Sequence, residues 1–346
     1  MWPCAVLLLG HFFISSVQAN CLVQYEQAAT GVGVPKATFN STPYCAYYGG
    51  VIVVTFNYRL NVLGFLKTNK FNISGNFGLK DQTTLLRWVQ RYIGNFGGDP
   101  AQVTLLGHSA GAGSVTHHLY IPQSKDLFHR MIVLSGSLLA SWSFMYEPRL
   151  CTESYLSDLQ PKTAIEFRTR AFEDFFIRNG TTGFAFGFAL MGTPCFIPEL
   201  EQEEFERDNY TVNAPHVSVL SPPITKLLAA GNVNSSEEAL QQIADVANLR
   251  YPMRRLAQDL AQTLHGTMPV YYLRFEFDGQ FGKAKYKEYI SYLPDSKYGA
   301  IHGDDLGYIF SPYNLEEALA KVDQYREEWR IHRWTVELIA NFIKHG

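Results

Sequence analysis

The clearest sign of chemistry in this chain is one pentapeptide, Gly107-His-Ser-Ala-Gly111. It has the form G-x-S-x-G, whose small residues let a strand and a helix meet at a sharp turn that exposes the serine hydroxyl. The apolar run Val103–Leu106 precedes it and a helical pattern follows it. We therefore predict Ser109 as a nucleophile and the backbone N–H of Ala110 as a donor to an oxyanion. The alternative, a serine in an incidental glycine-rich turn, does not account for this placement.

A nucleophilic serine needs a general base, and histidine is the usual one. His302 stands in the turn-rich segment Gly299–Leu306, after the apolar run Val270–Phe277, and a loop after a late strand is where the base of such an enzyme belongs. We therefore predict His302 as the base. We expect the two histidines of the helix after Ser109 to point away from it, and the two of the last helix to lie on the protein surface. The histidines after Ser109 are His117, His118, His129, His216, His265, His302, His332 and His345.

These groups must be positioned by regular structure, and the apolar patterns predict a β-α-β-α-β order. Such alternation indicates an α/β fold, with a mostly parallel sheet and helices on both of its faces. The expected elements are a strand at Val51–Tyr58, an amphipathic helix from about Gly78 to Ile93, a strand at Val103–Leu106, a helix at Ala110–Leu119 and a strand at Met131–Leu134.

The second half of the chain is less regular. Residues 147–244 are rich in charge and loop formers, which is typical of a cap-like region over a sheet. Regular structure is expected to return as a helix at Met253–Leu264, a strand at Val270–Phe277 and one long helix from about Leu315 to His345.

The first nineteen residues have the pattern of a secretory leader. No charged side chain occurs from Trp2 to Val17, and Val17-Gln-Ala19 supplies small residues for cleavage. A membrane anchor is the alternative, but it needs about 20 apolar residues, which are not found. We predict a cleaved signal peptide at residues 1–19, one domain at residues 20–346 and a secreted protein with no transmembrane segment.

Cysteines and glycosylation sequences agree with an oxidising compartment. Four cysteines remain after the leader, which permits two disulfide bonds in three possible connectivities, and none are close enough in sequence for a zinc knuckle. They are Cys21, Cys45, Cys151 and Cys195. Five N-x-S/T sequences, each a possible glycan site, begin at Asn40, Asn72, Asn179, Asn209 and Asn234.

Composition limits the partners. The 346 residues carry a formal net charge of −3 and only 18% of them are charged, whereas a nucleic-acid binder needs a basic surplus. We expect no nucleic-acid partner, and the motifs indicate neither a cofactor nor a metal.

Several longer motifs identify a family. The chain resembles type-B carboxylesterases, the cholinesterase-like group, and among them the secreted esterases of insects, over about Asn40 to Gly346. The motifs are Asn57-Tyr-Arg-Leu60, Gly75-Asn-Phe-Gly-Leu-Lys-Asp-Gln82, Phe96-Gly-Gly-Asp-Pro100, Val103 to Gly111, Leu134-Ser-Gly136 and His302-Gly-Asp-Asp-Leu306.

The resemblance implies an α/β-hydrolase fold and hydrolysis of small-molecule carboxylic esters through an acyl-enzyme on Ser109, with His302 as base and acid. It also implies that Ser135 and Asp305 support these residues from behind. The acid of the family's triad lies in a loop similar to Asn234-Ser-Ser-Glu-Glu238, which makes Glu237 the candidate. The same letters fit the start of a helix capped by Ser236, in which Glu237 is only an N-terminal carboxylate.

The chain departs from the family in length. The family has a His-Gly-Gly-Gly loop, and the strands before it, ahead of the strand matched by Val51–Tyr58; we find no counterpart here. N-terminal, middle and C-terminal pieces therefore look absent. We expect a poor esterase, because oxyanion donors are missing and an edge of the sheet is uncovered. The alternatives are a catalytically impaired, cholinesterase-like binding or adhesion protein, and an incomplete gene product.

Overall fold

The central feature of the fold is a four-stranded parallel sheet, in the strand order β4-β1-β7-β8. Its strands are β1 (Cys4–Gly10), β4 (Val51–Phe56), β7 (Gly98–His108) and β8 (Arg130–Leu134). This computed structural model describes residues 4–10, 21–23, 39–41, 50–140, 142–143, 148–170, 245–264, 266–282 and 299–346.

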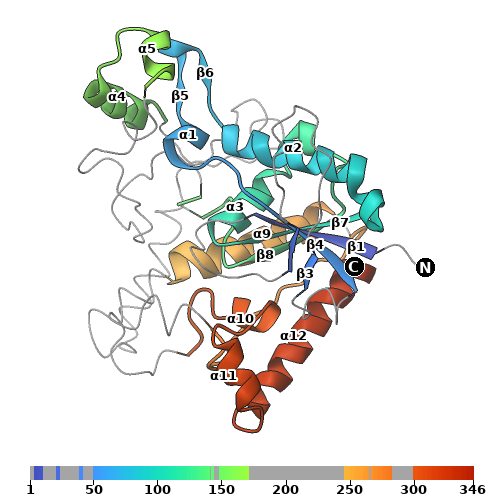
Figure 1. The fold of residues 1–346 in the computed structure, drawn as a ribbon. Helices are drawn as coiled ribbons and strands as arrows, with labels where there is room; N and C mark the ends of the chain where they lie inside the picture. The colour runs from blue at the N-terminus through green and yellow to red at the C-terminus, as the bar shows by residue number, and fades with distance from the viewer. Residues whose placement is uncertain are drawn as a thin grey trace, which may run out of the picture.

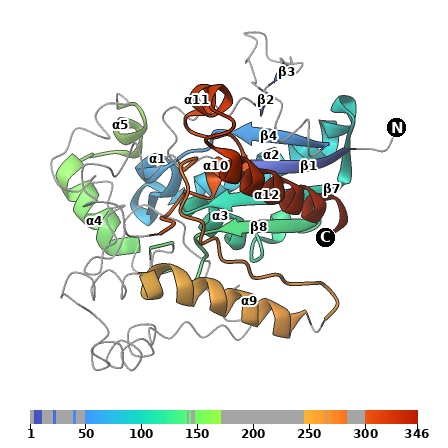
Figure 2. The ribbon, with the colours of Figure 1, turned by 90° about the horizontal axis from the view of Figure 1, so that it is seen from below.

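Helices cover both faces of this sheet, as the sequence predicts. On one face, α2 (Phe77–Tyr92) and α3 (Ala110–His117) pack their apolar side chains against β4 and β7. On the other face, α12 (Arg326–His345) packs Ile343 against the same two strands and β8. Figure 1 shows α2 above the sheet and α12 below it, and in the view from below α12 lies in front of the sheet (Figure 2). The α/β architecture is therefore confirmed.

The predicted elements around the nucleophile are present with adjusted ends. Val51–Phe56 is buried on both faces of the sheet, because Val51 and Val53 join one apolar cluster and Val54 joins the other. The strand predicted at Val103–Leu106 is longer, and begins at Gly98. The helix after Ser109 ends at His117.

One strand was not expected. β1 runs parallel to both of its neighbours, with Leu8 opposite Val54 in β4 and Leu105 in β7. It is formed by residues that the sequence analysis assigns to a leader, because an uncharged apolar run suits a buried parallel strand as well as a signal peptide. The expectation that the sheet lacks a strand ahead of Val51 is wrong for the uncut chain. A chain cut after Ala19 does not contain β1.

The later part of the chain differs from the prediction in two places. Val270–Phe277 forms no strand, because Phe275 and Phe277 pack on the ring of Tyr308, with centroids 5.3 and 5.5 Å away, instead of joining the sheet. The expected single C-terminal helix is two helices, α11 (Leu315–Ala320) and α12, separated by a turn.

The remaining described elements are short or peripheral. They are the hairpins β2 (Cys21–Val23) with β3 (Phe39–Ser41) and β5 (Lys67–Thr68) with β6 (Ile73–Ser74), the helices α1 (Asn61–Phe65), α4 (Pro148–Leu159), α5 (Ala164–Arg168), α9 (Tyr251–Thr263) and α10 (Leu306–Ile309), the 3-10 turns at Asn69–Phe71, Ile93–Phe96 and Pro122–Ser124, and a π-helix at Val246–Arg250. Within the described ranges, no helix has both the length and the apolar character needed to cross a membrane.

Candidate active site

Ser109 lies at the junction of β7 and α3 in a strained backbone conformation. Its φ of 57° and ψ of −122° are rare for a residue with a side chain. The conformation is held from both sides, because the Ser109 N–H donates to the carbonyl of Leu134 at 2.9 Å and the Ser109 carbonyl accepts from Gly113 N–H at 3.1 Å. This is the strand–turn–helix geometry that the pentapeptide indicates.

Glycine is required at two contacts of this turn. A Cβ on Gly107 would lie 2.2 Å from the carbonyl oxygen of Gly111, and one on Gly136 would lie 2.4 Å from that of Ser109. Ser135, next to Gly136, also has a positive φ, of 52°. The segment Leu134–Gly136 therefore packs directly against the backbone of Ser109, and the supporting role of Ser135 stays a prediction.

His302 contacts His108, the residue that precedes Ser109 in this turn. The imidazole rings of His302 and His108 are 4.5 Å apart between centroids and inclined by 33°. Within the described residues, Nδ1 of His302 and Nε2 of His108 are buried without a hydrogen-bond partner. Burial lowers the pKa of His302 to about 4. It also lowers the pKa of His108 to about 3, with added repulsion from His302. Both rings are therefore neutral near pH 7.

Hydrogen bonds to Asp304 and Asp305 hold the loop that carries His302. Asp304 is buried and its Oδ2 accepts the backbone N–H of Ile301 at 3.0 Å. The carbonyl of Asp305 accepts the N–H groups of Tyr308 and Ile309, which starts α10. Burial, with repulsion from Asp304, raises the pKa of Asp305 to about 6. These contacts hold the loop, and the other acid named above, Glu237, lies outside the described residues.

Among the described residues, the backbone N–H of Ala110 is the candidate donor at the turn. Ala110 is the first residue of α3, and a first-turn N–H has no carbonyl partner within its helix. In addition, β1 and β7 are parallel neighbours, so the carboxyl end of β1 reaches the edge of the sheet at which Ser109 lies. Residues 11–20, which follow β1, lie outside the described part of the chain.

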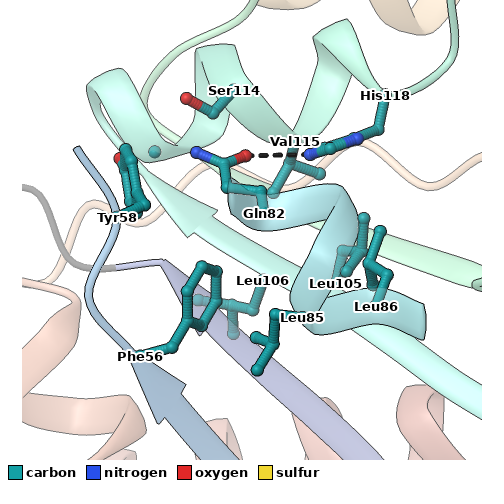
Figure 3. Close-up of a pocket in the computed structure, with 11 residues that line it drawn as sticks. Phe56, Tyr58, Gln82, Leu85, Leu86, Leu105, Leu106, Ser114, Val115 and His118 are labelled. Carbon is teal, nitrogen blue, oxygen red and sulfur yellow. Dashed lines mark hydrogen bonds between the residues drawn. The ribbon is translucent and has the colours of Figure 1, made fainter. Parts of the chain in front are cut away.

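A buried polar network supports α3 from behind. His118 hydrogen-bonds Gln82 Oε1 through Nε2 and Ser124 Oγ through Nδ1, both at 2.8 Å, and Ser124 contacts Thr83 Oγ1 at 3.0 Å. Figure 3 shows the Gln82 amide between His118 and Tyr58, at a cavity of about 20 Å³. Because both ring nitrogens of His118 are used in this network, it is not available as the base for Ser109.

Two other histidines have structural partners. His117, buried in α3, hydrogen-bonds the carbonyl of Ser143 at 3.1 Å. His332 was expected at the protein surface, but it is only 4% exposed and its Nδ1 lies 2.9 Å from the carbonyl of Tyr308. The correction has a physical cause, because α12 turns this face toward the aromatic cluster around Phe281, where His332 and Trp329 pack ring against ring.

The sequence reasoning missed the contact between His108 and His302. The variable position of a G-x-S-x-G pattern carries no signal of its own, and only the fold places its ring on His302. The residues that the structure describes contain no group of three or more histidine, cysteine or acidic side chains that could hold a metal.

Comparison with known proteins adds the family. Residues 36–165 and 199–346 match the Carboxylesterase family, which is well over half of the chain. The chain belongs to this family. Esterase E4 of Myzus persicae is 26% identical to it in an alignment 359 positions long. The alignment covers 85% of this chain and 63% of that protein. Esterase B1 of Culex pipiens is 55% identical over 95 residues, which cover 27% of this chain and 18% of that protein.

The solved juvenile hormone esterase of Manduca sexta has the same fold as this carboxylesterase-family chain. The two superpose with a TM-score of 0.70 over 99% of this chain and 71% of the other, at 22% sequence identity. The α/β-hydrolase fold is thereby confirmed. The chain spans less than two thirds of the length of the two curated relatives named above.

Proposed function

We propose that this carboxylesterase-family chain hydrolyses small carboxylic esters through an acyl-enzyme on Ser109. The observation that carries the proposal is the turn at Ser109, where a strained serine ends a buried strand and His302 packs beside the preceding residue. Strain of this kind is held at functional sites by the structure around it. Membership of the family supports esters as the substrate class.

The first half of the reaction transfers the acyl group. The Ser109 hydroxyl attacks the ester carbonyl, and its proton passes to the neutral imidazole of His302. The tetrahedral oxyanion accepts the N–H of Ala110, at the positive end of the α3 dipole. The intermediate then collapses, the protonated imidazole gives its proton to the departing alkoxide, and an alcohol leaves the acyl-enzyme.

The second half restores the serine. Water attacks the acyl carbonyl while His302 removes one of its protons, and the same N–H donates to the second oxyanion. Collapse returns the proton from His302 to Ser109 and releases the carboxylic acid. Glu237 is our proposal for the group that orients His302, and Ser135 and Asp305 hold the turn and the histidine loop.

We also propose that the protein is secreted, with residues 1–19 as a cleaved leader. One described sequon supports this location: Asn72 is exposed, at the left-handed end of a 3-10 turn, where a glycan has space. Asn40 lies in β3, and Asn179, Asn209 and Asn234 lie outside the described residues. Disulfide bonds among the four later cysteines belong to the same proposal, although Cys45 and Cys195 lie outside the described residues.

Ester turnover tests the proposed activity. We expect the uncut chain to release nitrophenol from a short-chain nitrophenyl ester, and Ser109→Ala and His302→Ala to lose at least about 10³-fold in kcat/KM. His345→Ala, which removes an exposed imidazole from the end of α12, is the control and should keep the activity. Equal turnover by Ser109→Ala would overturn the assignment.

A further inference from the structure

The contact between His108 and His302 has no part in the acyl-transfer scheme above. Two imidazoles lie with centroids 4.5 Å apart and planes inclined by 33°, a tilted contact at the short end of aromatic ring distances. Each ring has a buried nitrogen without a hydrogen-bond partner in the described part of the chain. A neutral ring pair is therefore packed at the point where one ring must accept a proton.

We propose that His108 is a positioning residue, whose ring face holds the imidazole of His302 toward Ser109 and stabilises the imidazolium that forms there. This inference rests on the proposed function. Its ground is the close, tilted ring contact, since no other described ring or hydrogen bond fixes the orientation of His302.

The electrostatic effect of His108 depends on which of the two rings carries the proton. Burial and repulsion from a charged His302 both disfavour a proton on His108, so the proton taken from Ser109 stays on His302. A cation over the face of a neutral aromatic ring within about 6 Å is attracted by the ring's electron density, most strongly where water is excluded. Stacking on His108 therefore favours the protonated state of His302 that exists only during the reaction, which raises the rate rather than substrate affinity.

The substitutions that separate this role from simple packing are His108→Phe and His108→Leu. Both fill the space of the ring, but only phenylalanine presents an aromatic face. We expect His108→Phe to react with a fluorophosphonate probe at a rate within about threefold of the wild type, and His108→Leu about tenfold more slowly, as expected for the loss of one desolvated cation–π contact. In ester turnover the loss should appear in kcat, with KM unchanged.

Thermal unfolding of both variants shows whether a loss of activity comes from lost packing. A purely structural role predicts that both variants lose activity in proportion to lost stability, and that the aromatic variant has no advantage. That result, or equal labelling rates for the wild type and His108→Leu, overturns the inference while leaving the proposed function intact. Absence of probe on Ser109 in the wild type overturns the proposed function, and this inference with it.

Discussion

At the scale of residues, the histidines around Ser109 are controlled by desolvation. His108, His117, His118 and His302 all have pKa values lowered mainly by burial, to about 3 or 4. Hydrogen bonds occupy His117 and His118, whereas the described residues give His302 no hydrogen bond through its buried Nδ1. Burial keeps His302 neutral and therefore able to accept a proton.

This desolvation predicts how the reaction rate changes at acidic pH. The base must be neutral to accept the serine proton, and a pKa lowered to about 4 keeps His302 neutral well below the ordinary value of 6.5. We expect the probe-labelling rate of Ser109 to halve near pH 4, with any change near pH 6, where Asp305 titrates, smaller than that. Circular dichroism at each pH verifies that the protein is folded. A midpoint near pH 6.5 would mean that His302 is solvated.

The chemistry at this scale could be read from the sequence only where a pattern is local. Ser109 and Ala110 follow from the pentapeptide, and the loop that contains His302 follows from its turn residues. The burial of His332 could not be predicted, because helical spacing places it on a face of α12 without indicating what packs on that face. The stack on His108 depends on two segments separated by more than 190 positions, which no local pattern records.

At the scale of elements, the turn between β7 and α3 depends on the space left by glycines. The strand and helix approach so closely that the Cβ of an alanine at position 107 would lie 2.2 Å from the carbonyl oxygen of Gly111. The backbone, rather than a flexible side chain, is the obstacle there. The turn can therefore form only if the next-to-last residue of β7, Gly107, has no side chain.

Gly107→Ala is expected to displace the turn. Overpacking of this kind costs about 1–3 kcal/mol of unfolding free energy and moves Ser109 away from His302, so ester turnover should fall with the urea midpoint. Gly94→Ala is the matched control, because nothing lies within 4 Å of its added Cβ. It should change the unfolding free energy by less than about 0.5 kcal/mol. Equal midpoints for the two variants would contradict the crowding seen at the turn.

The elements that sequence reasoning misjudged share one cause. Alternating or continuous apolar residues predict a buried surface but do not identify its partner. Val270–Phe277 has strand-like alternation, and its two phenylalanines bury against Tyr308 instead. Cys4–Gly10 has the composition of a leader, and in the uncut chain it pairs with two strands.

At the scale of the whole molecule, β1 links the chain's first residues to its catalytic strand. It lies between β4 and β7, so its removal leaves β4 without its partner in the sheet and β7 paired with β8 alone. An exported chain cut after Ala19 therefore differs from the uncut chain at the centre of the fold. The sequence analysis expects a poor esterase of the chain as written, and we expect the cut form to be a poorer esterase than the uncut chain.

Deletion of residues 1–19 tests this dependence. We expect the shortened chain to lose its cooperative urea transition and most of its ester turnover, because unpaired strand edges and apolar surface become exposed at the centre of the sheet. Deletion of residues 1–3 alone leaves β1 intact and serves as the control. An unchanged transition after the longer deletion would contradict the central place of β1. The N-terminus of the secreted protein, expected at Asn20, tells which form leaves the cell.

The central claim is that Ser109 is an activated nucleophile. The most direct measurement is to treat the folded, uncut chain with a fluorophosphonate and to locate the adduct by peptide mass spectrometry. The account predicts one adduct on Ser109, which disappears in Ser109→Ala and forms at least about 10³-fold more slowly in His302→Ala. An adduct on another residue, or equal labelling of Ser109→Ala, would contradict it.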